Sequence, residues 1–163
     1  RAAALPFARS TSQDPPAMRA RQIHDADGQR TYVVVLDAGD EVQDCLGRFA
    51  AAERLAAAQV TAIGAFERAT LKFFDWDTKD YLSRNIDEQT EVVSLIGDIA
   101  QDEDGSPHLH LHAVLAGRDM AARGGHLGQA IVRPTLEVIV TESPAHLRRR
   151  HDPASNLALI RLD

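Results

Sequence analysis

Three histidines alternate with leucines in the segment His108-Leu109-His110-Leu111-His112, and this alternation constrains the fold more than any other feature of the chain. Successive side chains of a β-strand point to opposite faces of a sheet, so the segment is typical of a strand rather than a helix. The leucines, continued by Ala113 and Leu115, would face a core, and the imidazoles would share the other face. The sequence therefore predicts a strand over residues 108–116 with an imidazole stripe opposite its apolar side.

A Gly-Gly-His sequence ends at His126, fourteen residues after His112. Neutral imidazole is the commonest metal ligand, and an open zinc site is typically held by three protein ligands. Because glycine permits a close backbone approach, a loop could bring His126 back beside the histidine strand. We predict that His110, His112 and His126 bind one divalent transition metal, with zinc as the expected ion and His108 as a spare or supporting group. The alternative is a solvated or hydrogen-bonded strand face that holds no ion.

Glu91 begins an apolar segment, residues 91–99, that is predicted to form another strand. If that strand neighbours the histidines, the carboxylate could be a further ligand, a hydrogen-bond acceptor behind a ligand, or a general base. An ordinary solvent-facing carboxylate is an equally good interpretation. The sequence has no Walker loop, dinucleotide glycine fingerprint, nucleophile elbow or Cys-x-x-Cys pair. Catalytic residues therefore stay unassigned, and Glu91 is the candidate only if the protein is an enzyme.

The composition indicates one soluble globular domain, with 44% hydrophobic and 26% charged residues in a chain of 163. A net charge of −6 argues against a surface wholly devoted to nucleic acid. The dense basic cluster Arg148-Arg149-Arg150 could contact phosphate, although a solvated or salt-bridging end explains it as well. Cys45, the one cysteine, fits the reducing cytoplasm and is expected to be a buried hydrophobe rather than a reactive thiol. No apolar run is long enough to span a membrane.

Apolar patterns along the rest of the chain predict one main helix and six to seven strands. The helix is expected over residues 41–58, where apolar side chains recur at helical spacing behind Asp40, a capping residue. Besides 91–99 and 108–116, strands are expected at 31–36, 60–66, 69–75, 136–141 and 157–162, with a possible hairpin strand at 20–26 and one helical turn at 145–150. This pattern favours an α+β fold with a mainly antiparallel sheet in a single domain over residues 20–163. Residues 1–19 are expected to be a tail or the remnant of a leader.

Seven segments then occur in a specific order: Leu36-Asp-Ala-Gly-Asp-Glu41, Ala62-Ile-Gly-Ala65, Ala69-Thr-Leu71 with Phe74-Asp75, Glu91-Val-Val-Ser-Leu-Ile-Gly97, His110-Leu-His112, Gly124-Gly-His-Leu127 and Glu137-Val-Ile-Val-Thr-Glu142. Their order and spacing resemble the plants-and-prokaryotes conserved (PPC) domain in its stand-alone bacterial form. The resemblance covers residues 20–163, and no single segment is diagnostic.

The resemblance implies a compact α/β domain that assembles as a homotrimer, with a metal site at His110, His112 and His126. Plant relatives join the domain to AT-hooks with an Arg-Gly-Arg-Pro core, which this sequence lacks. The DNA association of bacterial members therefore rests on fold-level analogy, and we expect weak DNA binding by the isolated domain. Two functions remain. One is an oligomeric regulatory or ligand-binding module; the other is a metal-dependent enzyme acting on an unknown small molecule through an open three-histidine site.

Overall fold

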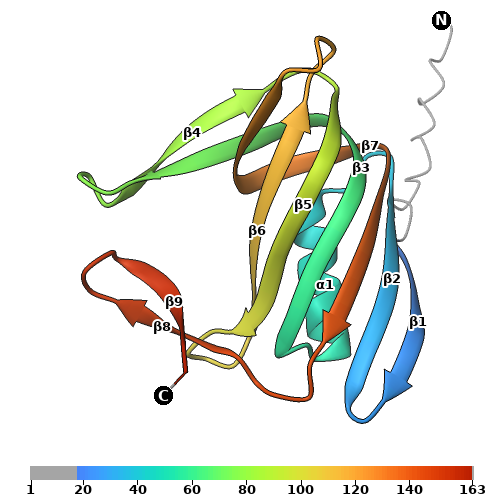
Figure 1. Cartoon of the computed structure of the whole chain (residues 1–163), viewed down its shortest axis with the longest axis vertical. Helices are drawn as coiled ribbons and strands as arrows, with labels where there is room; N and C mark the ends of the chain where they lie inside the picture. The colour runs from blue at the N-terminus through green and yellow to red at the C-terminus, as the bar shows by residue number, and fades with distance from the viewer. Residues whose placement is uncertain (1–17, 163) are drawn as a thin grey trace, which may run out of the picture.

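Nine strands and one helix succeed one another along residues 18–162, the part of the chain that this computed structural model describes (Figure 1). They are β1 (Arg19–Ala26), β2 (Gln29–Asp37), α1 (Val42–Glu53), β3 (Ala57–Asp75), β4 (Asp80–Ile86), β5 (Thr90–Gln101), β6 (Pro107–Ala116), β7 (Ala122–Glu142), β8 (Arg148–Asp152) and β9 (Leu157–Arg161). The tail predicted over residues 1–19 lies outside the described residues except for Met18 and Arg19, and Arg19 already belongs to β1.

Four of the strands close into a ring. β7 pairs with β3 along most of its length and with β6 at its start, and β5 joins β3 to β6. β2 and β1 extend the sheet beyond β7, and β4 pairs with the far end of β3. All these ladders are antiparallel, whereas β8 meets β5 in one parallel pair between Gln101 and Arg148. The predicted single domain of mostly sheet with one helix is confirmed. The predicted number of strands, six to seven, is wrong, because the described sheet has nine. The one parallel pair makes the sheet mixed rather than purely antiparallel.

The predicted two-sidedness of the histidine strand is confirmed. Leu111 and Leu115 of β6 are buried in the core, whereas His112 is exposed on the opposite face. α1 covers the core side and lies behind the sheet in Figure 1. Val42, Cys45, Leu46, Phe49 and Ala50 form the buried stripe of the helix. Cys45 is therefore a buried thiol, as predicted.

The helix is shorter than the sequence predicts at both ends. Glu41 is its N-cap, because the Glu41 side chain accepts a hydrogen bond from the Asp44 backbone N–H at 2.7 Å. The predicted cap, Asp40, instead accepts from the Asp37 N–H at 2.9 Å and closes the turn before the helix. Arg54 adopts a left-handed backbone with φ of 55°, which ends the helix, and residues from Ala57 onward belong to β3.

Four further segments differ from the sequence prediction. Residues 60–66 and 69–75 form one strand, β3, whose register shifts at Gly64 and again before residue 71. A side chain at Gly64 would bring its Cβ to 2.2 Å from the Thr135 carbonyl oxygen, so glycine allows β7 to lie close there. The helical turn predicted at 145–150 is wrong, since residues 145–147 are not helical and β8 begins at Arg148. β4 was not predicted, because six of its seven residues are not buried and no apolar pattern marks it. β7 begins at residue 122 rather than 136.

Candidate metal centre

His126 lies in a strand rather than in the loop that the sequence predicts. β7 starts as the antiparallel partner of β6, and His126 stands directly opposite His112. Side chains directly opposite in an antiparallel pair lie on the same face, so the two imidazoles are neighbours. On its other side His126 pairs with Lys72 of β3. A Cβ at Gly125 would lie 2.8 Å from the Lys72 carbonyl oxygen, which is why the residue before His126 is glycine.

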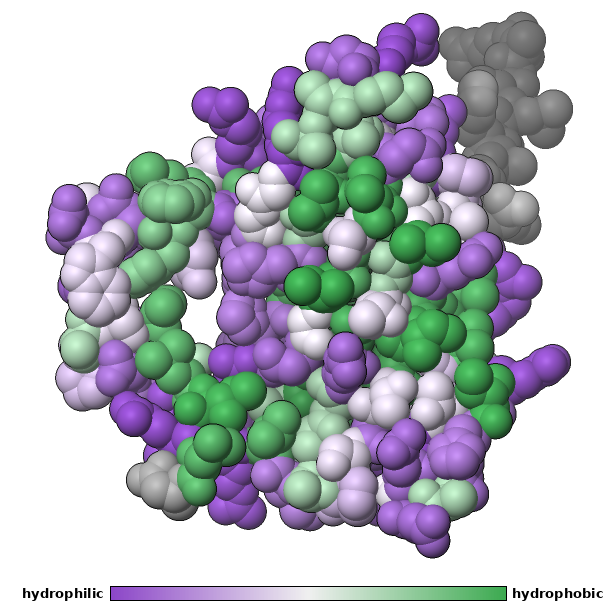
Figure 2. Space-filling model, viewed as in Figure 1, coloured by the Kyte–Doolittle hydropathy of each residue, from purple (hydrophilic) through white to green (hydrophobic). Residues whose placement is uncertain are grey.

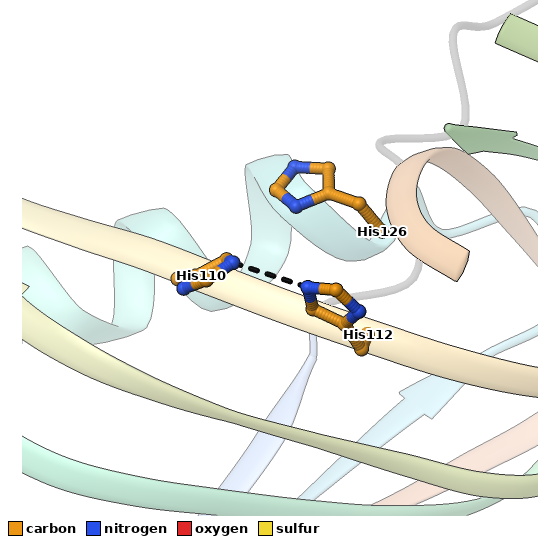
Figure 3. A group of neighbouring side chains, drawn as sticks. All are labelled: His110, His112 and His126. Atoms are coloured by element: carbon orange, nitrogen blue, oxygen red, sulfur yellow. Dashed lines mark hydrogen bonds between the residues drawn. The ribbon is translucent and has the colours of Figure 1, made fainter. Parts of the chain in front are cut away.

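The three histidines face a common space, His110 and His112 from β6 and His126 from β7 (Figure 3). The Nε2 atoms of His110 and His112 are 3.2 Å apart. The ring centroids are separated by 5.0 to 5.3 Å, and one nitrogen from each ring can be chosen so that all three lie within 4.8 Å of one another. Tetrahedral Zn²⁺ with bonds of ~2.0–2.1 Å separates its ligand nitrogens by about 3.3 Å. Small movements of the rings would therefore bring all three nitrogens to an ion.

Burial favours the uncharged form of two of these imidazoles, His126 and His110. The pKa of His126 falls from 6.5 to about 4, first because the ring is withdrawn from water and then because His110 and His112 adjoin it. The pKa of His110 is lowered as well, chiefly by burial and next by the nearby Arg149 guanidinium. The Nδ1 atom of His126 is buried and has no hydrogen-bond partner among the described residues. Neutral rings and an unpaired buried nitrogen fit a divalent cation.

Asp98 and Arg149 stand behind His110, although the sequence indicated neither of them as part of the site. Asp98 lies opposite His110 in the β5–β6 ladder, and its Oδ2 atom is 3.8 Å from His110 Nδ1. Arg149 Nη2 donates to Asp98 Oδ1 at 2.6 Å and lies 3.3 Å from His110 Nδ1. A charged residue within the apolar segment 91–99 was the available signal for Asp98, but its position beside His110 depends on the strand register.

Tyr81 and Lys72 border the centre on the side of His126. The Tyr81 ring from β4 lies 5.0 Å from the His126 ring, measured between centroids. Lys72 Nζ is 5.9 Å from the centroid of the Tyr81 ring. Both residues belong to the β3–β4 hairpin. Because β4 carries no apolar pattern, sequence reasoning had no signal for this side of the centre.

Apart from Arg149, the remaining predicted residues form no hydrogen bond with the three histidines in the described part of the chain. His108 forms a 2.9 Å hydrogen bond between its Nδ1 atom and Asp102 Oδ2, at the turn between β5 and β6. Glu91 is exposed and lies opposite Ala116, four residues along β6 from His112; this places it about 13 Å away along the strand. In the arginine cluster, Arg148 and Arg150 are exposed and Arg149 is buried.

The model of the Plants and Prokaryotes Conserved (PCC) domain matches residues 24–144, and the chain belongs to this family. The resemblance found in the sequence is thereby confirmed. No curated protein matches the chain in sequence. No helix in the described part of the chain has the length and apolarity that crossing a membrane requires.

Three solved structures share the fold over most of their length. A "putative DNA-binding protein" from Bacteroides thetaiotaomicron is 26% identical, with a TM-score of 0.80 over 89% of this chain and 97% of its own. A protein described in the same words from Ralstonia eutropha is 30% identical, with a TM-score of 0.75 over 81% and 91%. A "metal-containing protein" from Archaeoglobus fulgidus is 30% identical, with a TM-score of 0.74 over 80% and 92%.

Proposed function

We propose that the protein is a homotrimeric, metal-binding module of this family with a regulatory or ligand-binding role. His110, His112 and His126 hold one divalent transition ion, which we take to be zinc. The observation that carries the proposal is the convergence of three imidazoles, with one nitrogen from each within 4.8 Å of the others and with a buried His126 nitrogen that has no hydrogen-bond partner among the described residues. The Archaeoglobus neighbour, which is described as metal-containing, supports it.

Three protein ligands leave a position for an exchangeable group on a tetrahedral ion, and the ion would supply Lewis acidity there. His112 is the exposed member of the three, so a small molecule can approach from its side. Tyr81 and Lys72 adjoin His126 and offer such a molecule a hydroxyl group and a positive charge. The open side supports a ligand-binding role rather than a purely structural ion.

The second candidate is a metal-dependent enzyme that acts on a small molecule through the same open position. The open side at His112 favours it. General acid–base chemistry needs a titratable group within hydrogen-bonding reach of the substrate. Neither carboxylate meets this need, because Glu91 is about 13 Å from His112 along the strand and Asp98 is paired with Arg149. An enzyme would have to use Tyr81 or Lys72, which adjoin His126. We therefore place the binding module first.

Elemental analysis of protein purified without chelator tests the metal site. We expect about one zinc ion per chain in the wild type and less than about a tenth of that in His112→Ala, because two remaining imidazoles bind zinc poorly. His108→Ala is the matched control, since His108 belongs to the same strand but pairs with Asp102. Equal metal content in the wild type and His112→Ala would exclude these ligands.

The homotrimer is supported by the sheet face that α1 leaves uncovered. Several large aliphatic side chains are more than a third exposed in the part of the chain described: Ile63, Val93, Ile96 and Ile139. Ile96 lies directly opposite His112, so this apolar surface borders the metal centre. Figure 2 shows apolar side chains gathered in the middle of the face turned away from the helix. Exposed apolar patches of this kind usually mark protein interfaces.

Light scattering at micromolar concentration measures the assembly. We expect a mass three times that of the single chain. A monomer mass would contradict the trimer. It would not contradict the metal site, because all three proposed ligands come from one chain.

A further inference from the structure

The hairpin of β8 and β9 inserts one buried charge beside the metal centre. The Arg149 side chain is 4% exposed, whereas its neighbours Arg148 and Arg150 point into solvent. Burial of a guanidinium is costly unless it is paired. Arg149 is paired twice, by donating from Nη2 to Asp98 Oδ1 at 2.6 Å and from Nη1 to the Ala158 carbonyl at 2.9 Å. The hairpin lies beyond residue 144, where the family match ends.

The same two groups converge on the back of one metal ligand. His110 has its Nε2 atom directed at His112, with 3.2 Å between the two Nε2 atoms. Its other nitrogen, Nδ1, is 3.3 Å from Arg149 Nη2 and 3.8 Å from Asp98 Oδ2. The ring therefore has one nitrogen toward the centre and the other toward the charge pair.

The position of one proton follows from this geometry. A neutral imidazole carries a single N–H, and a nitrogen that binds a metal must offer a lone pair. If Nε2 of His110 binds the ion, Nδ1 carries the proton and must donate it in a hydrogen bond. Arginine has no acceptor, so Arg149 cannot receive that bond. Asp98 Oδ2 is a carboxylate acceptor on this side of the ring, 3.8 Å from Nδ1, and it must approach by about 0.8 Å, with Arg149 Nη2 moving from its present 3.3 Å position, to accept that hydrogen bond.

We propose that Asp98 and Arg149 are positioning residues for His110. Asp98 accepts the Nδ1 proton, which fixes the tautomer and the orientation of the ring, and Arg149 holds the Asp98 carboxylate in place. A carboxylate behind a ligating histidine also makes the histidine a stronger ligand. The β8–β9 hairpin thus sets the zinc affinity of a site whose ligands all lie elsewhere in the chain. This inference rests on the proposed metal site.

Zinc competition against a chromophoric chelator tests the pair on the full chain. We expect Asp98→Asn and Arg149→Gln to weaken zinc binding by about 10–100-fold, the usual effect of removing a partner of a ligand. Arg150→Gln is the matched control, because it removes the same charge from the exposed side of the same strand; its affinity should change less than about twofold. Arg149→Lys keeps the charge beside Asp98 and should recover part of the loss.

Long-range ¹H–¹⁵N NMR of the zinc-loaded protein separates positioning from a general loss of structure. The wild type should show His110 protonated at Nδ1 with a slowly exchanging proton, and Asp98→Asn should exchange that proton faster. If the wild type binds zinc and Asp98→Asn binds it with unchanged affinity, Asp98 and Arg149 do not position His110, and the proposed metal site is unaffected. Absence of zinc from the wild type would overturn both. If Arg149→Gln does not fold, Asp98→Asn decides alone.

Discussion

The two ends of β7 lie in opposite environments. Toward its C-terminus, Leu136, Val138 and Val140 are fully buried, and the carboxylate of Glu142 has both oxygens engaged, by the Ala56 N–H and by Arg30. Toward its N-terminus residues 122–124 are exposed, and the half-buried His126 keeps a buried nitrogen that has no hydrogen-bond partner among the described residues. Among the described residues, the C-terminal end of β7 has no buried side-chain polar atom without a partner, whereas the N-terminal end has one at His126. Unpaired buried groups in a folded protein commonly mark a functional site, because stability alone would remove them.

The largest effect is expected at the C-terminal end of β7. Leu136→Ala should lower the free energy of unfolding by about 2–5 kcal/mol, because it leaves a cavity in a core without solvent access. Zinc bound per folded molecule should stay the same. Urea denaturation and metal analysis measure the two quantities, and Glu137→Ala, at the exposed neighbouring position, is the control. Loss of zinc from folded Leu136→Ala would show that the two ends are not separable.

A smaller, pH-dependent effect is expected at the N-terminal end. In metal-free protein the pKa of His126 is about 4, below its ordinary 6.5, so the unfolded chain binds this proton more readily. Stability is therefore complete above pH 6.5 and is lost as the pH falls toward 4, by about 1–2 kcal/mol after allowance for solvent screening. Urea denaturation with chelator at pH 7 and pH 4.5 measures it.

His126→Leu removes the titrating group and the unpaired nitrogen together. Its stability should change less between the two pH values than that of the wild type. Carboxylates such as Asp104 and Asp152, whose pKa values are lowered by hydrogen bonds from serine, add the same background to both proteins. An identical pH response in the two proteins would mean that His126 does not lower the stability of the protein at low pH.

The smallest effect is expected outside β7, at the exposed arginines of β8. Arg149 is committed to Asp98, so each chain offers phosphate only Arg148 and Arg150 from this cluster. Because non-specific affinity falls steeply with salt, duplex DNA should bind weakly and without sequence preference at ~150 mM salt. Replacing both exposed arginines by glutamine should then change binding less than about twofold. Gel-shift titrations on random and AT-rich duplexes measure this, and sub-micromolar, sequence-selective binding would contradict it.

The sequence predicted the parts of the site that depend on local pattern. The alternation of His110 and His112 with leucines specifies a strand and its two faces whatever that strand pairs with. Gly-Gly-His indicated that His126 returns to the same place, although as a loop. The long β3 was predicted as two strands, because the polar residues Glu67 and Arg68 interrupt the apolar pattern, and the register of β3 on β7 shifts between Phe66 and Arg68.

The groups behind the ligands could not be predicted in the same way. Asp98 reaches His110 through the register of β5 on β6, and Arg149 reaches Asp98 from a hairpin about fifty residues further along the chain. Glu91 was predicted for such a role because it begins the correct strand, but it lies at the wrong end of that strand. A partner across a sheet is set by pairing register, which a single sequence does not encode as a local pattern.

The closed ring of β3, β5, β6 and β7 has a consequence for how the protein opens. None of these strands can separate without breaking ladders on both of its sides, so their backbone amides should exchange with solvent through one cooperative opening. β1 and the β8–β9 hairpin lie outside the ring and can open by themselves. An ion held by His126 favours the closed form by mass action. Such an ion would slow the exchange of the Val140 amide, at the far end of β7, as much as that of residues beside the histidines.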